Sequence, residues 1–322
     1  MAEIAIVGSG IAGLACARTL LDRGLSPTLF DKSRGFGGRI CTKRTDSGRF
    51  DHGAQYITAR DPKFESVIDT LRAAKAVTAW DGRFGIYDGG QFQDTELTTT
   101  RWVGTPRMSA IGRTLSGGLT CHLSHRIVAM RQTRDGWYLD ADGRHNIGPY
   151  DMVIVTCPGP QAAALLPAHS ALHSVANQLQ YFPCWAAMCS YTDPVALDYD
   201  GFHLKDSILS WACRDSSKPG RAPGERWVLH ADPNWSKNNL ELDATDAERV
   251  LTGFFRELCN TDPSHVYLHR WRYALSVEID GQSALFDQKT GLGLCGDALS
   301  TPKVEGAWLS GQHMAELILD TL

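Results

Sequence analysis

The sequence lacks the marks of a disulfide-bonded, zinc-binding or membrane protein. Its nine cysteines are an odd number and include no C-x-x-C pair, which argues against a disulfide framework or zinc ribbon and is typical of a reducing cytoplasm. No run of about 18 apolar residues appears, so no membrane-spanning helix is predicted. The formal net charge of -4 gives no general attraction to nucleic acid.

Several common catalytic motifs are missing too. The sequence contains no H-E-x-x-H, no G-x-x-x-x-G-K-[ST] and no G-x-S-x-G, and its eleven histidines show no metal-ligand spacing. No metal site is therefore predicted, and His52, His230 and His269 are first interpreted as packed or hydrogen-bonded side chains. The apolar N-terminal stretch lacks a basic n-region, so we expect no secretory signal and a cytoplasmic location.

What is present is the composition of a large globular protein. The chain has 322 residues, of which 43% are hydrophobic and 21% are charged. This length exceeds the size at which a single hydrophobic core stops growing, so two lobes are expected. No internal repeat or low-complexity stretch is present.

The N-terminal stretch IAIVGSGIAGLACARTLL predicts a strand, a tight turn and a helix. Gly8, Gly10 and Gly13 form the G-x-G-x-x-G pattern, in which glycines turn the chain, admit a pyrophosphate and let helix and strand pack closely. A second predicted strand, LSPTLF, ends at Asp31, about 20 residues on, where the motif places an acid for a ribose. The sequence therefore predicts a dinucleotide site at a helix N-terminus.

The nine residues DKSRGFGGR, 31–39, bear on which dinucleotide is bound. A nicotinamide enzyme usually continues from the ribose acid into its next helix, whereas this chain enters a loop with further glycines and a cation: Gly35, Gly37, Gly38 and Arg39. The loop backbone can lie against an extended ligand, and Arg39 can donate to a phosphate. The segment resembles the acid-to-GGR element of the amine-oxidase superfamily of flavoproteins, which implies FAD.

Other segments extend this resemblance along the chain. RFDHGAQYITARD resembles the superfamily's D-x-G-A element beside the flavin, with Asp51, Gly53 and Ala54 as the matching residues, and Gly296-Asp297 resembles the element that contacts the ribityl chain. The helix that begins near Val304 would then direct its N-terminus at the flavin N1–C2=O edge. The FAD contacts that the resemblance implies are Gly8, Gly10, Ala12, Gly13, Asp31, Lys32, Gly38, Arg39, Gln55, Tyr56, Val128, Asp297, Val304, Glu305 and Gly306. No cysteine stands at a recognised attachment position, so non-covalent FAD is expected.

The predicted fold is α/β, with a Rossmann-type FAD-binding lobe built on a parallel sheet and an antiparallel-sheet substrate or cap domain, in a p-hydroxybenzoate-hydroxylase-like topology. The FAD-binding domain is expected to comprise 1–61, 105–160 and 271–322, and the cap 62–104 and 161–270. Glycines in DGRFGIYDGGQF suggest short antiparallel strands, and SWAC, RWVLHADPNW and YLHRWRYAL are further predicted strands. The loop SSKPGRAPGE, 216–225, is expected to be an exposed turn.

Within the superfamily, the segments FDHGAQYIT, HRWRYA and CGD-A-L…EGAW-SG most resemble the renalase family, in particular its bacterial members. The resemblance implies oxidation of 2-dihydro- or 6-dihydro-NAD(P) to NAD(P)+ by hydride transfer to flavin N5, with O2 reduced to H2O2. His230 would help to position the nicotinamide, and the expected substrate contacts are Ile57, Thr58, Arg60 and Lys303. The alternatives are an amine oxidase or desaturase of the same superfamily, or a cofactor-binding module without activity. The substrate isomer, the NAD or NADP preference and the oligomeric state stay open.

Overall fold

The structure is a computed structural model that describes residues 2–96, 98–279, 281 and 283–322. One lobe is built on a six-stranded sheet with the strand order β19-β20-β13-β1-β2-β9. Neighbouring strands are parallel except β19, which pairs antiparallel with β20. The strands are β1 (Ile4–Val7), β2 (Thr28–Asp31), β9 (Thr120–Leu123), β13 (Met152–Val155), β19 (Ala284–Asp287) and β20 (Leu292–Cys295).

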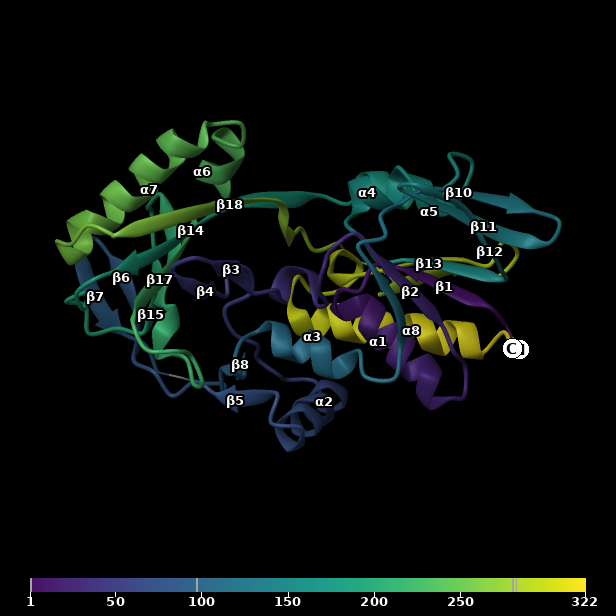
Figure 1. Ribbon diagram of the computed structural model, residues 1–322, viewed down its shortest axis with the longest axis horizontal. Helices are drawn as coiled ribbons and strands as arrows, with labels where there is room; N and C mark the ends of the chain where they lie inside the picture. Colours follow the sequence, from purple (N-terminus) through teal and green to yellow (C-terminus); the bar gives the residue numbers. More distant parts are fainter. Residues whose placement is uncertain (1, 97, 280, 282) are drawn as a thin grey trace.

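Both faces of this parallel sheet are covered, as its continuous apolar strands require (Figure 1). On one side lie α1 (Ile11–Asp22), α3 (Ser109–Leu115) and α8 (Val304–Leu319). On the other lie α4 (Gly159–Ala163), α5 (Ala171–Gln178) and a meander of β10 (Ile127–Thr133), β11 (Gly136–Ala141) and β12 (Arg144–Tyr150). Helices α1 and α8 approach closely, since a Cβ at Gly311 would collide with the carbonyl oxygen of Ala12.

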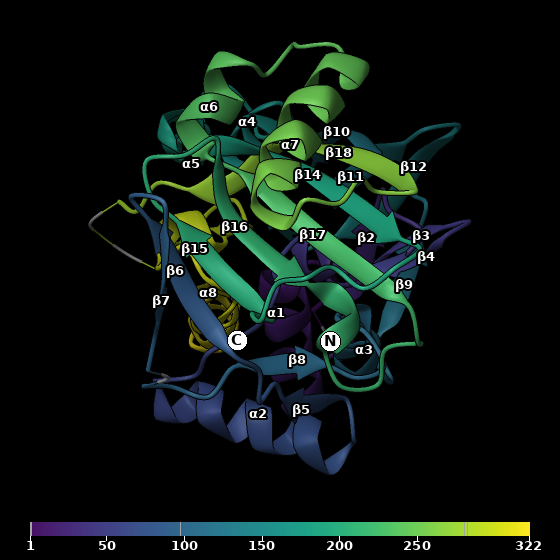
Figure 2. The ribbon, with the colours of Figure 1, turned by 90° about the vertical axis from the view of Figure 1, so that its left-hand side faces the viewer.

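The second lobe is built on a seven-stranded sheet with the order β18-β14-β17-β16-β15-β6-β7, antiparallel except where β6 runs beside β15. Its strands are β6 (Phe84–Asp88), β7 (Gln91–Asp94), β14 (Tyr181–Tyr191), β15 (Gly201–Leu204), β16 (Leu209–Arg214), β17 (Glu225–Ala231) and β18 (His265–Ser276). Helices α6 (Pro233–Asn238) and α7 (Ala244–Cys259) cover its outer face (Figure 2). Trp227 and Leu229 pack against Phe255 there.

Shorter elements complete the fold. They are α2 (Pro62–Ala73), the pairs β3 (Lys43–Thr45) with β4 (Gly48–Phe50) and β5 (Val77–Ala79) with β8 (Trp102–Gly104), and the 3-10 turns Gly38–Ile40, Asp215–Ser217 and Asp297–Leu299. Among the helices of the described ranges, none combines the length and the hydropathy that a membrane crossing would need.

The α/β class and the two predicted kinds of sheet are confirmed. Helix α5 and part of α4 fall inside the 161–270 range expected for the cap, yet they pack in the apolar cluster of the parallel sheet through Ala162, Leu172 and Ala176. Helices α2 and α7 stand in segments for which the sequence analysis predicts only strands. The division into an FAD-binding lobe and a cap remains our proposal, with 161–179 now placed beside the parallel sheet.

Candidate active site

The predicted glycine turn has the tight geometry that requires glycine. Gly8 has φ +118°, and a Cβ there would meet the Thr156 hydroxyl; a Cβ at Gly13 would collide with the Gly8 carbonyl oxygen. At Gly10, which caps α1, a Cβ would meet no atom within 4 Å. The turn is therefore packed behind Gly8 and Gly13 and open at Gly10, as the approach of a pyrophosphate requires.

The second glycine loop lies directly beside the first. Gly37 donates its N–H to the Ser9 carbonyl oxygen over 2.9 Å and forms an isolated β-bridge with Gly10. Gly37 and Gly38 have φ of 97° and 57°, and a Cβ at Gly38 would lie 3.4 Å from the Gly10 Cα. The segment DKSRGFGGR thus joins the dinucleotide turn, and the two bare backbones together fit a long phosphate-bearing ligand.

Asp31, the predicted ribose acid, holds this turn together from the end of β2. One carboxylate oxygen accepts the Ser9 N–H at 2.6 Å and the Ser9 hydroxyl at 2.8 Å, and the other accepts the Ser33 N–H at 2.7 Å. Lys32 instead donates to the Gln161 side chain at 3.1 Å. Val128, predicted to present backbone to the adenine, is 44% exposed beside a β-bulge.

Arg39 and Asp297, predicted to contact different parts of FAD, form a two-pronged ion pair with each other. Arg39 also donates to the Ala274 carbonyl oxygen at 3.0 Å, and the Ser276 hydroxyl donates to Asp297 at 2.7 Å. Burial alone would lower the pKa of Arg39, but the Asp297 carboxylate raises it. The pair brings the GGR loop and the Gly-Asp element to one place, as a ligand spanning both would require.

The loop after Asp51 turns three successive carbonyl groups toward side-chain donors. Gln55 donates its amide N–H groups to the carbonyl oxygens of Asp51 and Gly53, the latter at 2.9 Å. The His52 carbonyl oxygen accepts from His230 Nε2 at 3.1 Å and from Trp271 Nε1 at 3.0 Å. Because a carbonyl can only accept, His230 carries its proton on Nε2.

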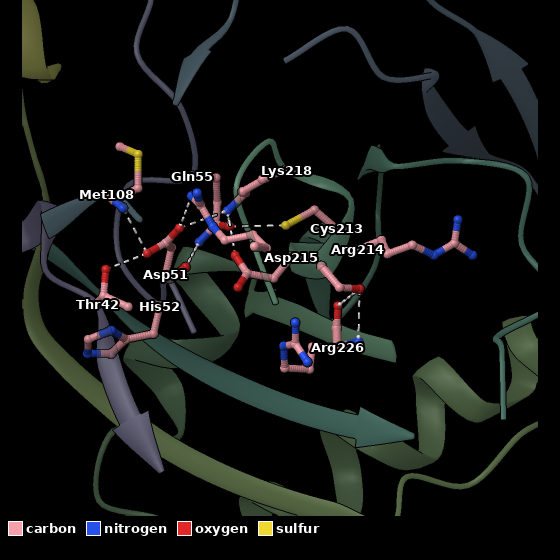
Figure 3. A network of polar contacts seen from close by, with 12 residues as sticks. Thr42, Asp51, His52, Gln55, Met108, Cys213, Arg214, Asp215, Lys218 and Arg226 are labelled. Carbon is pink, nitrogen blue, oxygen red and sulfur yellow. Dashed lines mark hydrogen bonds and ion pairs between the residues drawn. The ribbon is translucent and has the colours of Figure 1, made fainter. Parts of the chain in front are cut away.

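A buried charged network missed by the sequence analysis contacts this loop (Figure 3). Lys218, whose side chain is 0% exposed, donates from Nζ to Gln55 Oε1 at 2.8 Å and to Asp215 at 2.7 Å. The Cys213 thiol lies 3.0 Å from the same Gln55 oxygen. Arg221 forms an ion pair with Asp51, which also accepts from the Thr42 hydroxyl.

The expectation that 216–225 is an exposed turn holds for residues 220 and 222–224 but is wrong for Lys218 and Arg221, whose side chains are buried. Its glycines and prolines do form turns, but the side chains of two cations in it point into the core. There Lys218 forms an ion pair with Asp215, and Arg221 forms one with Asp51. Burial alone would lower the pKa of Lys218, yet Asp215 and neighbouring groups raise it. Burial would likewise raise the pKa of Asp51, but Lys218 and Arg221 lower it. No pattern along the chain signals these pairings.

One row of side chains crosses the inner face of the seven-stranded sheet. Strand register aligns His269, Ala186, His230, Trp211, His203 and Ile86 from β18 to β6. Directly paired residues share a face, and this one faces the loop described above, because His230 contacts His52. His52 itself packs against His269 and Trp271, with ring centroids 4.7 and 4.9 Å apart.

The histidines of this region are neutral at physiological pH. Burial lowers the pKa of His52 to about 3 and that of His230 to about 4. Burial also lowers the pKa of His203 and of His269. The inner face therefore offers flat rings and neutral imidazoles rather than a cluster of cations.

A charged group lies beside this row. The guanidinium carbon of Arg101 is 3.7 Å from the ring centroid of Phe84, 4.7 Å from that of Tyr56 and 5.7 Å from that of Trp211. Its Nη1 is buried without a hydrogen-bond partner, and burial lowers the pKa of the side chain. The sequence analysis did not single out Arg101.

The N-terminus of α8 contacts the loop that carries the expected substrate residues. Glu305, buried, accepts the N–H groups of Arg60 and Asp61 at 2.7 and 2.8 Å. The side chains of Arg60 and Lys303 are exposed and Thr58 is half-buried. Ile57 is 2% exposed and packs in the core, so its side chain does not reach a substrate; we withdraw it as a contact. A Cβ at Gly306 would collide with the Thr301 carbonyl oxygen, which explains the glycine there.

A cavity of ≈ 340 Å³ adjoins Asp51. It is lined by Thr42, Gly48, Arg49, Asp51, Pro106, Arg107, Gly220, Arg221, Ala222 and Arg226. In the part of the chain that the structure describes, no group of three or more His, Cys, Asp or Glu side chains is placed to hold a metal ion.

The fold and the paired glycine loops define a dinucleotide-binding flavoprotein, and comparison with known proteins specifies the family. Residues 6–71 match an NAD(P)-binding Rossmann-like domain, and residues 102–319 match the flavin-containing amine oxidoreductase family. The chain belongs to this amine oxidoreductase family, and FAD is its cofactor.

Curated relatives match over short segments. Protoporphyrinogen oxidase 2 of Arabidopsis thaliana is 35% identical over 69 residues, 21% of this chain and 14% of the relative. Putrescine oxidase of Kocuria rosea is 30% identical over 105 residues, 30% of this chain and 22% of the relative. The chain thus matches well under two thirds of the length of these relatives.

Solved structures resemble the whole fold. A proposed protoporphyrinogen oxidase from Exiguobacterium sp. 255-15 has a TM-score of 0.80 at 15% identity, over 98% of both chains. Wild-type putrescine oxidase bound to putrescine has a TM-score of 0.77 at 13% identity, over 99% of both chains. At these identities the likeness shows the fold alone.

Proposed function

We propose that the protein is a renalase-like oxidase of 2-dihydro- or 6-dihydro-NAD(P). The substrate, O2 and one proton would give NAD(P)+ and H2O2, with FAD as the acceptor of the hydride. The observation that carries the proposal is the inner row of His269, His230, Trp211 and His203, which supplies flat, neutral groups. A dihydropyridine already carries a transferable hydride, so it needs a surface to stack on and no strong base.

His230 is the proposed positioning residue. Its Nε2–H is used by the His52 carbonyl oxygen, which leaves Nδ1 as the acceptor of the ring. The lowered pKa of His230, about 4, keeps that nitrogen unprotonated at neutral pH. It is therefore suited to accept from the carboxamide N–H₂ of a nicotinamide.

The predicted FAD contacts remain proposals that the geometry supports to different degrees. Gly8, Gly10, Gly13 and Gly38 line the two glycine loops, and Arg39 and Asp297 meet beside them. Gln55 and Glu305 would act by orienting backbone, because their side chains are bonded within the protein. For the substrate, Thr58, Arg60 and Lys303 stay as rim contacts.

The test is anaerobic mixing of the FAD-loaded protein with 2-dihydro-NAD, 6-dihydro-NAD, ordinary NADH and putrescine, each followed by flavin absorbance. We expect rapid bleaching by an isomeric dihydro-NAD, with colour and one equivalent of H2O2 returning in air. Bleaching by putrescine alone would assign the protein to the amine oxidases instead. A His230→Ala variant with unchanged reduction rate and substrate affinity would remove the proposed role of that residue.

A further inference from the structure

Arg101 is a cation without a counter-ion among the residues that the structure describes. Within the described residues, no carboxylate lies within ion-pair distance of its guanidinium. Its buried Nη1 has no hydrogen-bond partner either. Arginine keeps its proton under all ordinary conditions, so the group stays a cation despite the cost of burial.

The rings around Arg101 offset only part of that cost. Phe84 lies at 3.7 Å and Tyr56 at 4.7 Å from the guanidinium carbon, distances at which a ring face attracts a cation. Tyr56 also contributes a side-chain hydrogen bond to Arg101, but Nη1 is left without an acceptor, and a buried donor without an acceptor is unfavourable. Because Arg101 as a whole is half-buried, a ligand that brings an anionic oxygen to its guanidinium would supply the missing charge.

The position of Arg101 indicates which part of a ligand it would meet. Tyr56 directly follows Gln55 in the loop at the inner sheet face, and Trp211 is paired with His230 in the cross-sheet row. Arg101 therefore lies at the edge of the surface on which the dihydropyridine is proposed to stack. In a pyridine nucleotide, the first anionic group beyond the ring and its ribose is a phosphate.

We propose that Arg101 forms an anion subsite that binds the phosphate nearest the nicotinamide riboside, and so selects phosphorylated over unphosphorylated ligands. This inference rests on the proposed function for the identity of the ring, while the unpaired, half-buried Arg101 side chain with its orphaned Nη1 stands independently of it. The cations expected from the sequence, Arg60 and Lys303, are exposed. Water solvates their charges, so leaving them unpaired costs less free energy. The same cation would disfavour a cationic polyamine at this position.

The experiment compares nicotinamide mononucleotide with nicotinamide riboside, two ligands that differ by one phosphate. Each is titrated into FAD-loaded wild type, Arg101→Met and Arg101→Lys, and the dissociation constant is taken from the perturbation of flavin absorbance. We expect wild type to prefer the mononucleotide, and Arg101→Met to lose that preference by roughly ten-fold or more, the scale of one charge-assisted hydrogen bond. Arg101→Lys should keep part of it, and affinity for the riboside should change little.

Arg83 provides the matched control, because it also lies over a ring, Tyr199 at 4.6 Å, but has a counter-ion in Asp94. Arg83→Met should leave both dissociation constants unchanged. Equal preference for the mononucleotide in wild type and Arg101→Met, with both proteins folded and holding FAD, would overturn the subsite. Because Met removes an unpaired cation and keeps the bulk, the variant is expected to fold.

A second arm separates the subsite from the proposed function. Inorganic pyrophosphate carries the anion without a nicotinamide, and its dissociation constant is measured on the same proteins. If pyrophosphate binding falls in Arg101→Met while no dihydronicotinamide reduces the flavin, the subsite stands and the proposed function fails. If dihydro-NAD reduces the flavin but neither phosphate ligand distinguishes wild type from Arg101→Met, the function stands and the subsite fails.

Discussion

The Lys218 ammonium lies 2.8 Å from Gln55 Oε1, and this contact determines which way the Gln55 amide points. An ammonium group only donates, so the amide oxygen must face Lys218 and the amide nitrogen must face the carbonyl groups of Asp51 and Gly53. A cation in the second lobe thereby orients a loop of the first. Asp215, 2.7 Å from the same ammonium, holds the cation in place.

Removing Lys218 alone should destabilise the folded protein. Lys218→Met leaves the buried Asp215 carboxylate without its cation, and we expect a loss of about 3–5 kcal/mol in the free energy of unfolding. The measurement is urea unfolding of the FAD-loaded protein. The double variant Lys218→Met/Asp215→Asn removes both charges and should recover most of that loss. The exposed pair of Lys205 with Asp88 is the control: Lys205→Met should cost under about 1 kcal/mol. A double variant no more stable than the single one would contradict this account.

The two glycine types of the dinucleotide turn should respond differently to alanine. Gly10→Ala meets no protein atom within 4 Å, so the fold should persist while FAD binding is lost, because the methyl group occupies the ligand's approach. Gly13→Ala collides with the Gly8 carbonyl oxygen and should lose stability as well as FAD. Thermal unfolding and bound-flavin absorbance separate the two outcomes. Gly253→Ala, in the middle of α7 with open space around it, should instead stabilise by roughly 0.5–1 kcal/mol. Normal FAD content in Gly10→Ala would place the pyrophosphate elsewhere.

The neutral histidines predict loss of stability in acid. The folded pKa values of about 4 for His230 and about 3 for His52 lie below the ordinary 6.5. Between those limits the unfolded chain binds protons that the folded protein does not, so the free energy of unfolding falls as pH falls below 6.5 and levels off only below the folded pKa values. Each histidine can contribute up to about 1.4 kcal/mol per pH unit.

Urea unfolding between pH 7 and pH 4.5 measures this slope. His230→Gln removes one titrating group while keeping an N–H donor for the His52 carbonyl oxygen, so its slope should be shallower than that of wild type. His145→Gln, at a side chain that is 72% exposed, is the control and should keep the wild-type slope. Parallel profiles for wild type and His230→Gln would show that His230 is not held neutral by burial.

We expect Glu305, in the first turn of α8, to stabilise the loop at Arg60 and Asp61 more than the helix itself. Its carboxylate accepts from the N–H groups of Arg60 and Asp61, so Glu305→Ala should cost about 1.5–3 kcal/mol in unfolding free energy, and Glu305→Gln less because it keeps an acceptor. Hydrogen exchange of the Arg60 and Asp61 amides should accelerate in the alanine variant. Glu316→Ala, at an exposed ion pair on the same helix, should leave that exchange unchanged.

Local sequence signals predicted the elements whose geometry is set by neighbouring residues. The β1 turn and α1 are recognisable because Gly8 adopts a positive φ and Gly13 packs on the Gly8 carbonyl five positions earlier, and the glycines of 81–92 correctly indicated the β6–β7 hairpin. Helix α2 was missed although Asp61 followed by Pro62 is a helix start signal, with Asp61 capping the Lys63 N–H. The glycine pattern further on outweighed it.

The dinucleotide turn, the second glycine loop and several strands, among them β1, β2, β16 and β18, follow from the order of residues along the chain, because backbone sterics and alternation act over a few positions. The pairing of Arg39 with Asp297, of Gln55 with Lys218 and of Trp211 with His230 does not, since each joins residues from separate elements. Burial of a lysine in a turn rich in glycine and proline depends on carboxylates that only folding brings near. Only the tertiary structure could therefore show a neutral, aromatic face with Arg101, unpaired among the described residues, at its edge.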